Sequence, residues 1–119
     1  MIRSKKMLRA ARDQSCVNCG ARDGTVVAAH YQGMRSQQLG KGMGIKPHDL
    51  CIADLCRACH AAFDAKDVKY DVSSITGFGK SIDHSEQFLY LIMKTLLRRI
   101  EQGVLTVDSA AKPDGLQDG

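Results

Sequence analysis

The stretch Leu55-Cys56-Arg57-Ala58-Cys59-His60-Ala61-Ala62-Phe63-Asp64 joins a Cys-x-x-Cys turn to a short predicted helix. His60 and Asp64 are four residues apart, so this helix presents both side chains on one face. A second Cys-x-x-Cys, Cys16-Val17-Asn18-Cys19, lies far upstream. Two such pairs separated by a domain-sized loop have the ligand set and spacing of a structural zinc site. We therefore expect Zn²⁺ to be held by Cys16, Cys19, Cys56 and Cys59.

The rest of the sequence argues against other uses of these cysteines. Residues 1–12 are basic and lack the apolar segment of a secretory signal, so disulfides are not expected. No thioredoxin-like βαβ pattern surrounds either pair, which argues against a thiol oxidoreductase. No uncharged apolar run reaches transmembrane length, and we expect a cytoplasmic protein of a bacterial host without a membrane partner. The fifth cysteine, Cys51, lies in an apolar run and is expected to be a small buried residue.

The composition predicts one small, basic domain. The chain has 119 residues, no tryptophan, three phenylalanines and three tyrosines, so its core must be modest. A zinc ion that joins distant segments would stabilise such a core. The net charge of +4 favours an anionic partner such as nucleic acid. We expect a single domain over residues 1–105 with its core at about 13–68, and a disordered tail over 106–119.

Residue patterns predict an N-terminal helix followed by a β-hairpin and a second helix. Residues 3–12 mix basic and apolar side chains as an amphipathic helix does. Thr25–His30 is β-branched and small and follows an Asp-Gly turn signal, and the apolar stretch Leu50–Leu55 is long enough to be its return strand. This hairpin would bring the two cysteine pairs together, and a helix from about Ala58 to Lys66 would follow.

The longest helix is predicted over about residues 83–103. Asp83 or Ser85 is expected at its N-cap and Gly103 at its end, and His84 is expected to be solvent-exposed. Its predicted apolar stripe consists of Phe88, Leu89, Ile92, Met93, Leu96, Leu97 and Ile100. The stripe either packs on the zinc domain or forms a dimer interface. Three apolar residues before this helix are expected to anchor the intervening segment on the core: Tyr70, Ile75 and Phe78.

Residues 31–49 form a glycine-rich, basic segment with no acid before Asp49. Such a loop can place amides and cationic side chains against a phosphate backbone. The cations expected to contact DNA are Arg35, Lys41 and Lys46. The other interpretation is a loop with ordinary surface charges.

The order of these features resembles the HNH or ββα-metal nucleases, and most closely the YbcO-like endonucleases of phages and prophages. The motifs that carry the resemblance cover roughly residues 7–70: Ser15–Gly20, Ala28–Tyr31, Lys46–Leu50, Leu55–His60 and Phe63–Asp64. The resemblance implies an α+β fold in which a small zinc-stapled ββα-metal core is flanked by an N-terminal helix and a longer C-terminal helix. It also implies a metal-dependent DNA endonuclease linked to DNA recombination or processing.

Each role that the resemblance implies suits the chemistry of its residue. His30 would act as the general base, because a neutral imidazole can take a proton from water. His60 and Asp64 would bind a catalytic Mg²⁺ or Mn²⁺, with water and phosphate oxygens completing its shell. Asp49 would orient His30 by accepting a hydrogen bond from its ring, although Asp54 is an alternative for this role.

The sequence departs from the family pattern at one position. Many HNH enzymes place an aspartate ligand immediately before the base histidine, where this chain has Ala29. The catalytic metal site therefore has one ligand fewer or is completed by another residue. His48 is interpreted as a loop residue.

A second function from another class is a zinc-ribbon nucleic-acid-binding protein without catalysis. Such a protein has no use for a histidine directly after its last cysteine, an acid four residues later and another histidine at a strand end. The endonuclease is therefore the favoured hypothesis. The preferred DNA structure or sequence, and the choice between monomer and homodimer, stay open.

Overall fold

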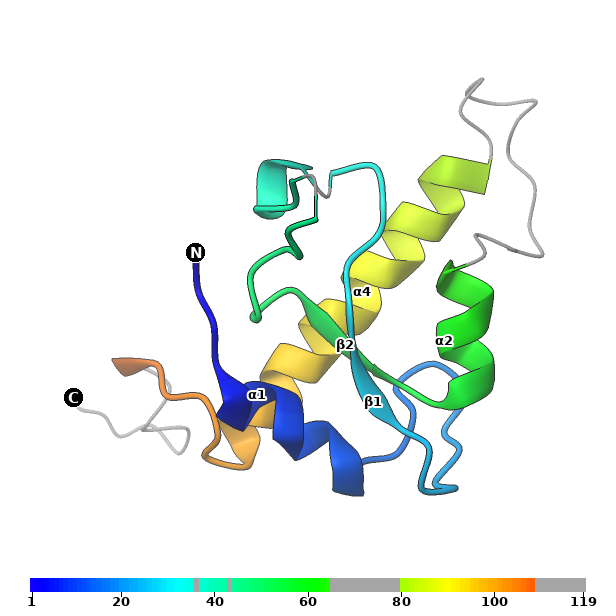
Figure 1. The fold of residues 1–119 in the computed structure, drawn as a ribbon. Helices are drawn as coiled ribbons and strands as arrows, with labels where there is room; N and C mark the ends of the chain where they lie inside the picture. The colour runs from blue at the N-terminus through cyan, green and yellow to red at the C-terminus, as the bar shows by residue number, and fades with distance from the viewer. Residues whose placement is uncertain (36, 43, 65–79, 109–119) are drawn as a thin grey trace.

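The computed structural model describes residues 1–35, 37–42, 44–64 and 80–108, with only the backbone for residues 80–82. The described part contains two antiparallel strands surrounded by helices (Figure 1). In chain order the elements are α1 (Lys5–Arg9), the 3₁₀ helix η1 (Ala10–Asp13), β1 (Val27–His30), the 3₁₀ helix η2 (Gln37–Leu39), β2 (Ile52–Leu55), α2 (Arg57–Asp64) and α4 (Lys80–Glu101). The fold is thus a small mixture of helix and sheet, as predicted.

The hairpin is the centre of this arrangement. β1 and β2 pair in antiparallel fashion, with Val27 opposite Leu55 and His30 opposite Ile52. Every residue of β2 is buried, whereas Ala29 is the only fully buried residue of β1. The predicted strand and its return strand are both confirmed, each shortened at its N-terminal end. Because β2 leads directly into α2, the hairpin places the second cysteine pair beside the first.

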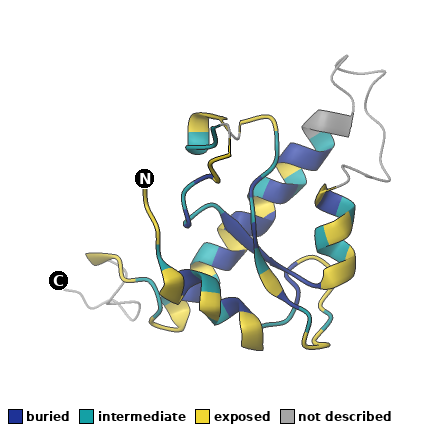
Figure 2. Ribbon diagram, viewed as in Figure 1, coloured by how far each residue is buried: buried dark blue, intermediate teal, exposed yellow. Residues whose placement is uncertain are grey.

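Helices cover the hairpin from several sides (Figure 1). The long α4 crosses behind the hairpin in this view and packs on β2, while α1 contacts β1 and α2 contacts β2. Three aromatic rings join these parts: Phe88 of α4 lies 5.4 Å from Tyr31 and 4.9 Å from Phe63 of α2, between ring centroids. Such tilted and edge-to-face contacts stabilise beyond the area that they bury. Figure 2 shows the buried residues along the hairpin and the inner side of α4.

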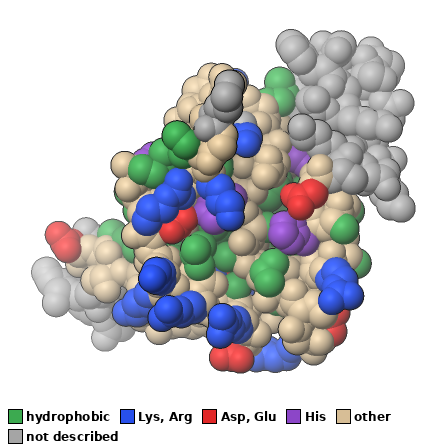
Figure 3. Space-filling view, viewed as in Figure 1, with side chains coloured by type: hydrophobic (Ala, Val, Ile, Leu, Met, Phe, Trp, Pro, Cys, Tyr) green, Lys and Arg blue, Asp and Glu red, His purple; other side chains and the backbone are tan. Residues whose placement is uncertain are grey.

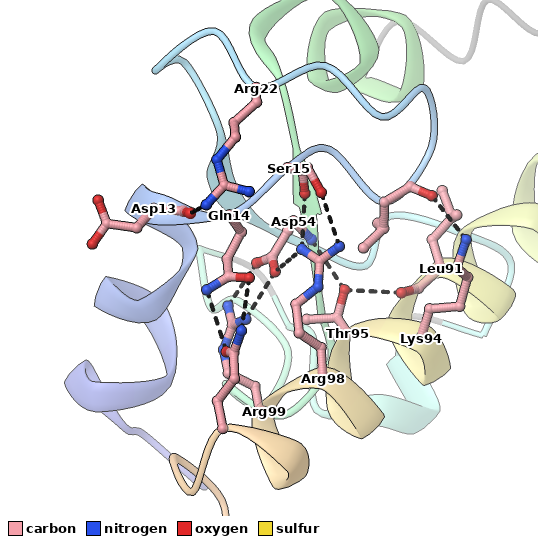
Figure 4. Close-up of polar contacts among 12 residues, drawn as sticks. Asp13, Gln14, Ser15, Arg22, Asp54, Leu91, Lys94, Thr95, Arg98 and Arg99 are labelled. Atoms are coloured by element: carbon pink, nitrogen blue, oxygen red, sulfur yellow. Dashed lines mark hydrogen bonds and ion pairs between the residues drawn. The ribbon is translucent and has the colours of Figure 1, made fainter.

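A buried ion pair fixes α4 to β2 (Figure 4). Both side chains are fully buried, and Arg99 donates in bidentate fashion to Asp54, over 2.8 Å to Oδ2 and 2.6 Å to Oδ1. Arg98 donates to Oδ2 as well, over 3.1 Å, and Thr95 Oγ1 accepts the Asp54 N–H. Planar two-point pairing of this kind is the geometry in which a buried charge is best satisfied.

The start and the buried face of α4 differ from the sequence prediction. The helix begins at Lys80, so Asp83 and Ser85 lie inside it rather than at its N-cap, and Ser85 Oγ accepts the Met34 N–H. Met93 and Leu97 are 56% and 58% exposed, so they do not pack on the zinc domain, and a dimer interface on this part of the stripe stays a prediction. The buried face instead consists of His84, Ser85, Phe88, Leu91, Ile92, Thr95 and Arg99.

The two ends of α4 illustrate one wrong and one accurate expectation. His84 is only 2% exposed, and its Nε2 donates to the carbonyl oxygen of Phe63 over 2.8 Å, so the expected solvent exposure is wrong. The predicted C-terminal end is close to the observed one. Gly103 follows the helix with φ of +76°, a conformation that glycine adopts without steric cost, and Val104 N–H donates to Arg99 O.

The predicted N-terminal helix is divided into α1 and η1. The expected anchors Tyr70, Ile75 and Phe78, and the tail from residue 109, lie outside the described residues. Within the described part of the chain, no helix combines the length and apolar character needed to cross a membrane.

Candidate functional site

The four predicted zinc ligands form one cluster. The sulfur atoms of the two Cys-x-x-Cys pairs all lie within 4.8 Å of one another, and Cys19 Sγ is 3.7 Å from Cys56 Sγ. A tetrahedral zinc ion with Zn–S bonds of about 2.3 Å separates its sulfur ligands by about 3.8 Å. The cluster therefore fits Zn²⁺, in agreement with the prediction for Cys16, Cys19, Cys56 and Cys59.

Local backbone geometry shapes the first cysteine turn. Gly20 has φ of +82°, and its N–H donates to Cys16 O over 2.9 Å. A side chain at this position would strain that conformation. Val17 N–H donates to Asp54 O over 2.9 Å, which ties the turn to β2. The same strand thus holds the first pair and leads into the second.

The electrostatics of the cluster favour a bound cation. Burial raises the pKa of Cys59 to about 12, whereas for Cys16 burial is outweighed by backbone N–H donors that lower its pKa to about 7. Four thiolates at this spacing repel one another unless a cation neutralises them. A divalent ion would therefore displace the remaining thiol protons as it binds.

Two amides outside the cluster support it. Asn18 Nδ2 donates to Cys59 Sγ over 3.2 Å, and Gln87 Nε2 of α4 donates to Asn18 Oδ1 over 3.2 Å. Contacts of this kind orient a metal's ligands. The sequence placed Asn18 in the turn but gave no sign of its contact with Gln87, which is 69 residues away.

His30 lies at the end of β1 in contact with Asp49. The Nε2 of His30 is 2.7 Å from Asp49 Oδ1, and the two side chains are 9% and 5% exposed. Of the two aspartates that the sequence left open, Asp49 is therefore the one beside His30, whereas Asp54 pairs with Arg99. The burial of Asp49 would raise its pKa, but hydrogen bonds from His30, the Ser4 N–H and Arg3 outweigh burial and lower it.

The hydrogen bond determines which ring nitrogen of His30 carries the proton. An ionised carboxylate only accepts, so Nε2 must donate. The neutral imidazole then keeps its lone pair on Nδ1. No hydrogen bond to that nitrogen is formed within the described part of the chain. Nδ1 of His30 is thus the ring nitrogen with a lone pair that can accept a hydrogen bond.

His60 and Asp64 lie one turn apart on α2, as predicted. His60 Nε2 is 3.3 Å from Asp64 Oδ2, and their side chains are 35% and 51% exposed. They line an open hollow of about 510 Å³ together with Gly24, Thr25, Val27, Arg57 and Ala61. Adjacent ligands of an octahedral Mg²⁺, each about 2.1 Å from the ion, lie about 3 Å apart, so the two atoms are close enough to share one ion.

A divalent ion bound by His60 and Asp64 would have few protein ligands. Among the described residues, the four cysteines are the only grouping of three or more metal-binding side chains. His30 and Asp49 are not among the residues that line the hollow beside His60 and Asp64. Water and substrate oxygens would therefore have to complete the shell of an ion there. Ala29, directly before His30, is buried and has a methyl side chain that offers no ligand atom.

The loop before β2 is ordered by contacts of its own. His48 N–H donates to Leu39 O over 3.1 Å, and Gly42 and Ile45 exchange two backbone hydrogen bonds of 3.0 Å. The three cations predicted to contact DNA differ in exposure: Arg35 and Lys46 are exposed, and Lys41 is half-buried. Figure 3 shows Lys and Arg side chains gathered over α1 and above it, on the face that also presents histidine and acidic side chains.

The predicted site residues thus fall into a four-cysteine cluster, a largely buried His30–Asp49 pair, a partly exposed His60–Asp64 pair and a basic loop. Comparison with known proteins adds no assignment, because no family model, curated protein or solved structure matches this chain.

Proposed function

We propose that this chain is a metal-dependent DNA endonuclease of the HNH (ββα-metal) type, with a role in DNA recombination or processing in a phage or prophage. The observation that carries the proposal is the contact between His30 and Asp49 at the end of β1, in a hairpin that leads directly into a helix with His60 and Asp64. A zinc ribbon needs none of these four side chains.

His30 is the proposed general base. With Nε2 held by Asp49, Nδ1 takes a proton from water as the water oxygen forms a bond to phosphorus. The bond from phosphorus to the 3′ oxygen breaks in the same displacement, and the leaving 3′ oxygen takes a proton from a solvent water. Asp49 keeps the ring in one orientation and stabilises the imidazolium that forms.

His60 and Asp64 are the proposed ligands of Mg²⁺ or Mn²⁺. A divalent ion bound there would stabilise the charge that develops on the phosphate and on the leaving oxygen. The half-buried His60 and the exposed Asp64 line an open hollow, which leaves room for a DNA backbone to approach. Arg57, which lines the same hollow, adds a cation for the phosphate.

DNA would be held chiefly through its phosphates. The proposed contacts are made by Arg35, Lys41 and Lys46 of the loop between the strands, and weak sequence preference is expected because phosphate contacts carry no base information. The four cysteines would hold a structural Zn²⁺ that takes no part in hydrolysis.

Nicking of a supercoiled plasmid tests this proposal. Zinc-loaded wild-type protein in Mg²⁺ or Mn²⁺ is expected to convert the plasmid to nicked circles, and His30→Ala is expected to lose at least about a hundredfold in rate. His48→Gln is the matched control, because His48 lies in the same loop as Asp49 and glutamine can still accept the Ile2 N–H.

The zinc content of every variant must be equal, since loss of the structural ion alone would abolish activity. Equal nicking by wild type and His30→Ala would contradict the role of His30. If no variant cuts but all retard DNA on a gel, the non-catalytic zinc-ribbon protein becomes the better account.

A further inference from the structure

The first residues of the chain lie along the segment that ends at Asp49. Ile2 N–H donates to His48 Nδ1 over 2.8 Å, and Asp49 N–H donates to Ile2 O over 2.9 Å. Ser4 N–H donates to Asp49 Oδ2 over 2.7 Å. Asp49 is therefore held by backbone groups from a segment about 45 residues earlier in the chain.

The guanidinium group of Arg3 adds further hydrogen bonds between residues 2–4 and the segment that ends at Asp49; these contacts together are called the N-terminal clamp. One of its terminal nitrogens, Nη1, donates to Asp49 Oδ1 over 3.0 Å and also to Pro47 O, and the other, Nη2, donates to Lys46 O over 2.7 Å. A planar guanidinium can serve several acceptors at fixed angles, which a lysine cannot do. Arg3 therefore fixes both the Asp49 side chain and the backbone that precedes it.

The N-terminal clamp and His30 both donate hydrogen bonds to the same carboxylate oxygen of Asp49. Asp49 Oδ1 accepts from Arg3 Nη1 and from His30 Nε2, and the carboxylate is 5% exposed. Without Arg3, Oδ1 would keep only His30 as a donor, and the carboxylate could rotate about its remaining contact with Ser4. The imidazole of His30 would then lose its fixed acceptor at Nε2.

We propose that Arg3 is a positioning residue for His30, acting through Asp49 to hold the imidazole in the tautomer with hydrogen on Nε2 and a free lone pair on Nδ1. The importance of this tautomer for catalysis rests on the proposed function. The tautomer itself is a property of the protein without DNA. The role of Arg3 is thus measurable whether or not the chain is a nuclease.

The experiment compares zinc-loaded, full-length wild type with Arg3→Gln, Arg3→Lys and Lys6→Gln. Lys6 is exposed on α1, so Lys6→Gln removes the same charge from the same region. Long-range ¹H–¹⁵N NMR of the His30 ring reports which nitrogen is protonated. We expect a single Nε2–H tautomer in wild type and Lys6→Gln, ring nitrogens averaged between tautomers in Arg3→Gln, and intermediate values in Arg3→Lys.

Nicking kinetics provide the second readout. Arg3→Gln is expected to lower kcat about tenfold with KM changed less than about twofold, whereas Lys6→Gln leaves kcat within about twofold of wild type. A lower kcat with a nearly unchanged KM distinguishes an effect on His30 from a general loss of DNA binding.

His30 ring shifts in Arg3→Gln identical to those of wild type would overturn the inference. So would an equal change in Lys6→Gln. Should Arg3→Gln lose its zinc, the decision rests on Arg3→Lys, whose ring shifts must then differ from those of wild type. If wild type cuts no DNA in any metal, the proposed function fails, while the ring shifts still decide the role of Arg3.

Discussion

At the scale of single residues, Asn18 shows how a side chain that binds no metal can support a metal cluster. Its amide nitrogen donates to Cys59 Sγ, and its amide oxygen accepts from Gln87 of α4. A hydrogen bond to sulfur stabilises the thiolate form that zinc needs. Burial opposes this form at Cys59, where the pKa is raised to about 12.

Replacing Asn18 is therefore expected to weaken zinc binding. Asn18→Ala should raise the zinc dissociation constant about tenfold, because residues that hydrogen-bond to metal ligands typically contribute ten- to a hundredfold to metal affinity. Competition with a chromophoric chelator measures the change. Glu86→Ala, a substitution of an exposed side chain on α4 beside Gln87, is the control, and an equal loss in both variants would contradict a specific role for Asn18.

The sequence indicates local partners more readily than distant ones. The spacing of the cysteines and of His60 and Asp64 is local, and the structure brings each pair together as expected. The hydrogen bond from Arg3 to Asp49 crosses 46 residues, and no repeating pattern in the sequence signals it. From the sequence alone, Arg3 therefore cannot be distinguished from the other basic residues of the N-terminal segment.

At the scale of secondary structure, the contact between α4 and β2 depends on charge as well as apolar packing. Asp54 and Arg99 are both fully buried, and Arg99 Nε also donates to the backbone oxygen of Met7. Removing one member of a buried pair leaves the other charge without compensation. The docking of α4 is therefore sensitive to a single polar substitution.

Asp54→Ala is expected to lower the free energy of unfolding by about 3–5 kcal/mol, the usual effect of breaking a buried ion pair. Urea unfolding of the zinc-loaded protein measures this change. Met93→Ala is the control on the same helix, because Met93 is 56% exposed and its loss should change the free energy by less than about 1 kcal/mol. Equal effects of the two substitutions would contradict the account of this contact.

The buried face of α4 illustrates what periodicity cannot predict. Phe88 and Ile92 follow the apolar pattern and are buried as expected. Arg99 and His84 are buried because Asp54 and the carbonyl of Phe63 satisfy them, and these partners come from elements distant in sequence. A pattern that scores side chains by polarity alone places both residues in solvent.

At the scale of the whole molecule, the zinc cluster joins two segments that lie far apart in the sequence. It connects the loop before β1 to the start of α2, on either side of the hairpin. Apparent zinc binding energies on the order of 10–16 kcal/mol are comparable with the stability of an entire domain. The cluster is therefore expected to be necessary for folding.

Removal of zinc with a strong chelator should abolish most of the helical circular dichroism signal, and added Zn²⁺ should restore it.

Zinc binding should also weaken as the pH falls, because a thiol such as Cys59, with its pKa raised to about 12, must release its proton to bind zinc. The stability that zinc contributes is thus present at neutral pH and lost in acid. A metal-free protein with unchanged helical signal at pH 7 would contradict this expectation.

The central claim of the proposed function is that hydrolysis needs a second, exchangeable ion at His60 and Asp64, distinct from the structural zinc. The most direct measurement is the nicking rate as a function of Mn²⁺ concentration at constant zinc content, for wild type and Asp64→Asn. We predict a rate that saturates with Mn²⁺ in wild type and needs at least about tenfold more Mn²⁺ in Asp64→Asn. A nicking rate independent of added Mn²⁺, or the same Mn²⁺ dependence in both proteins, would contradict the claim.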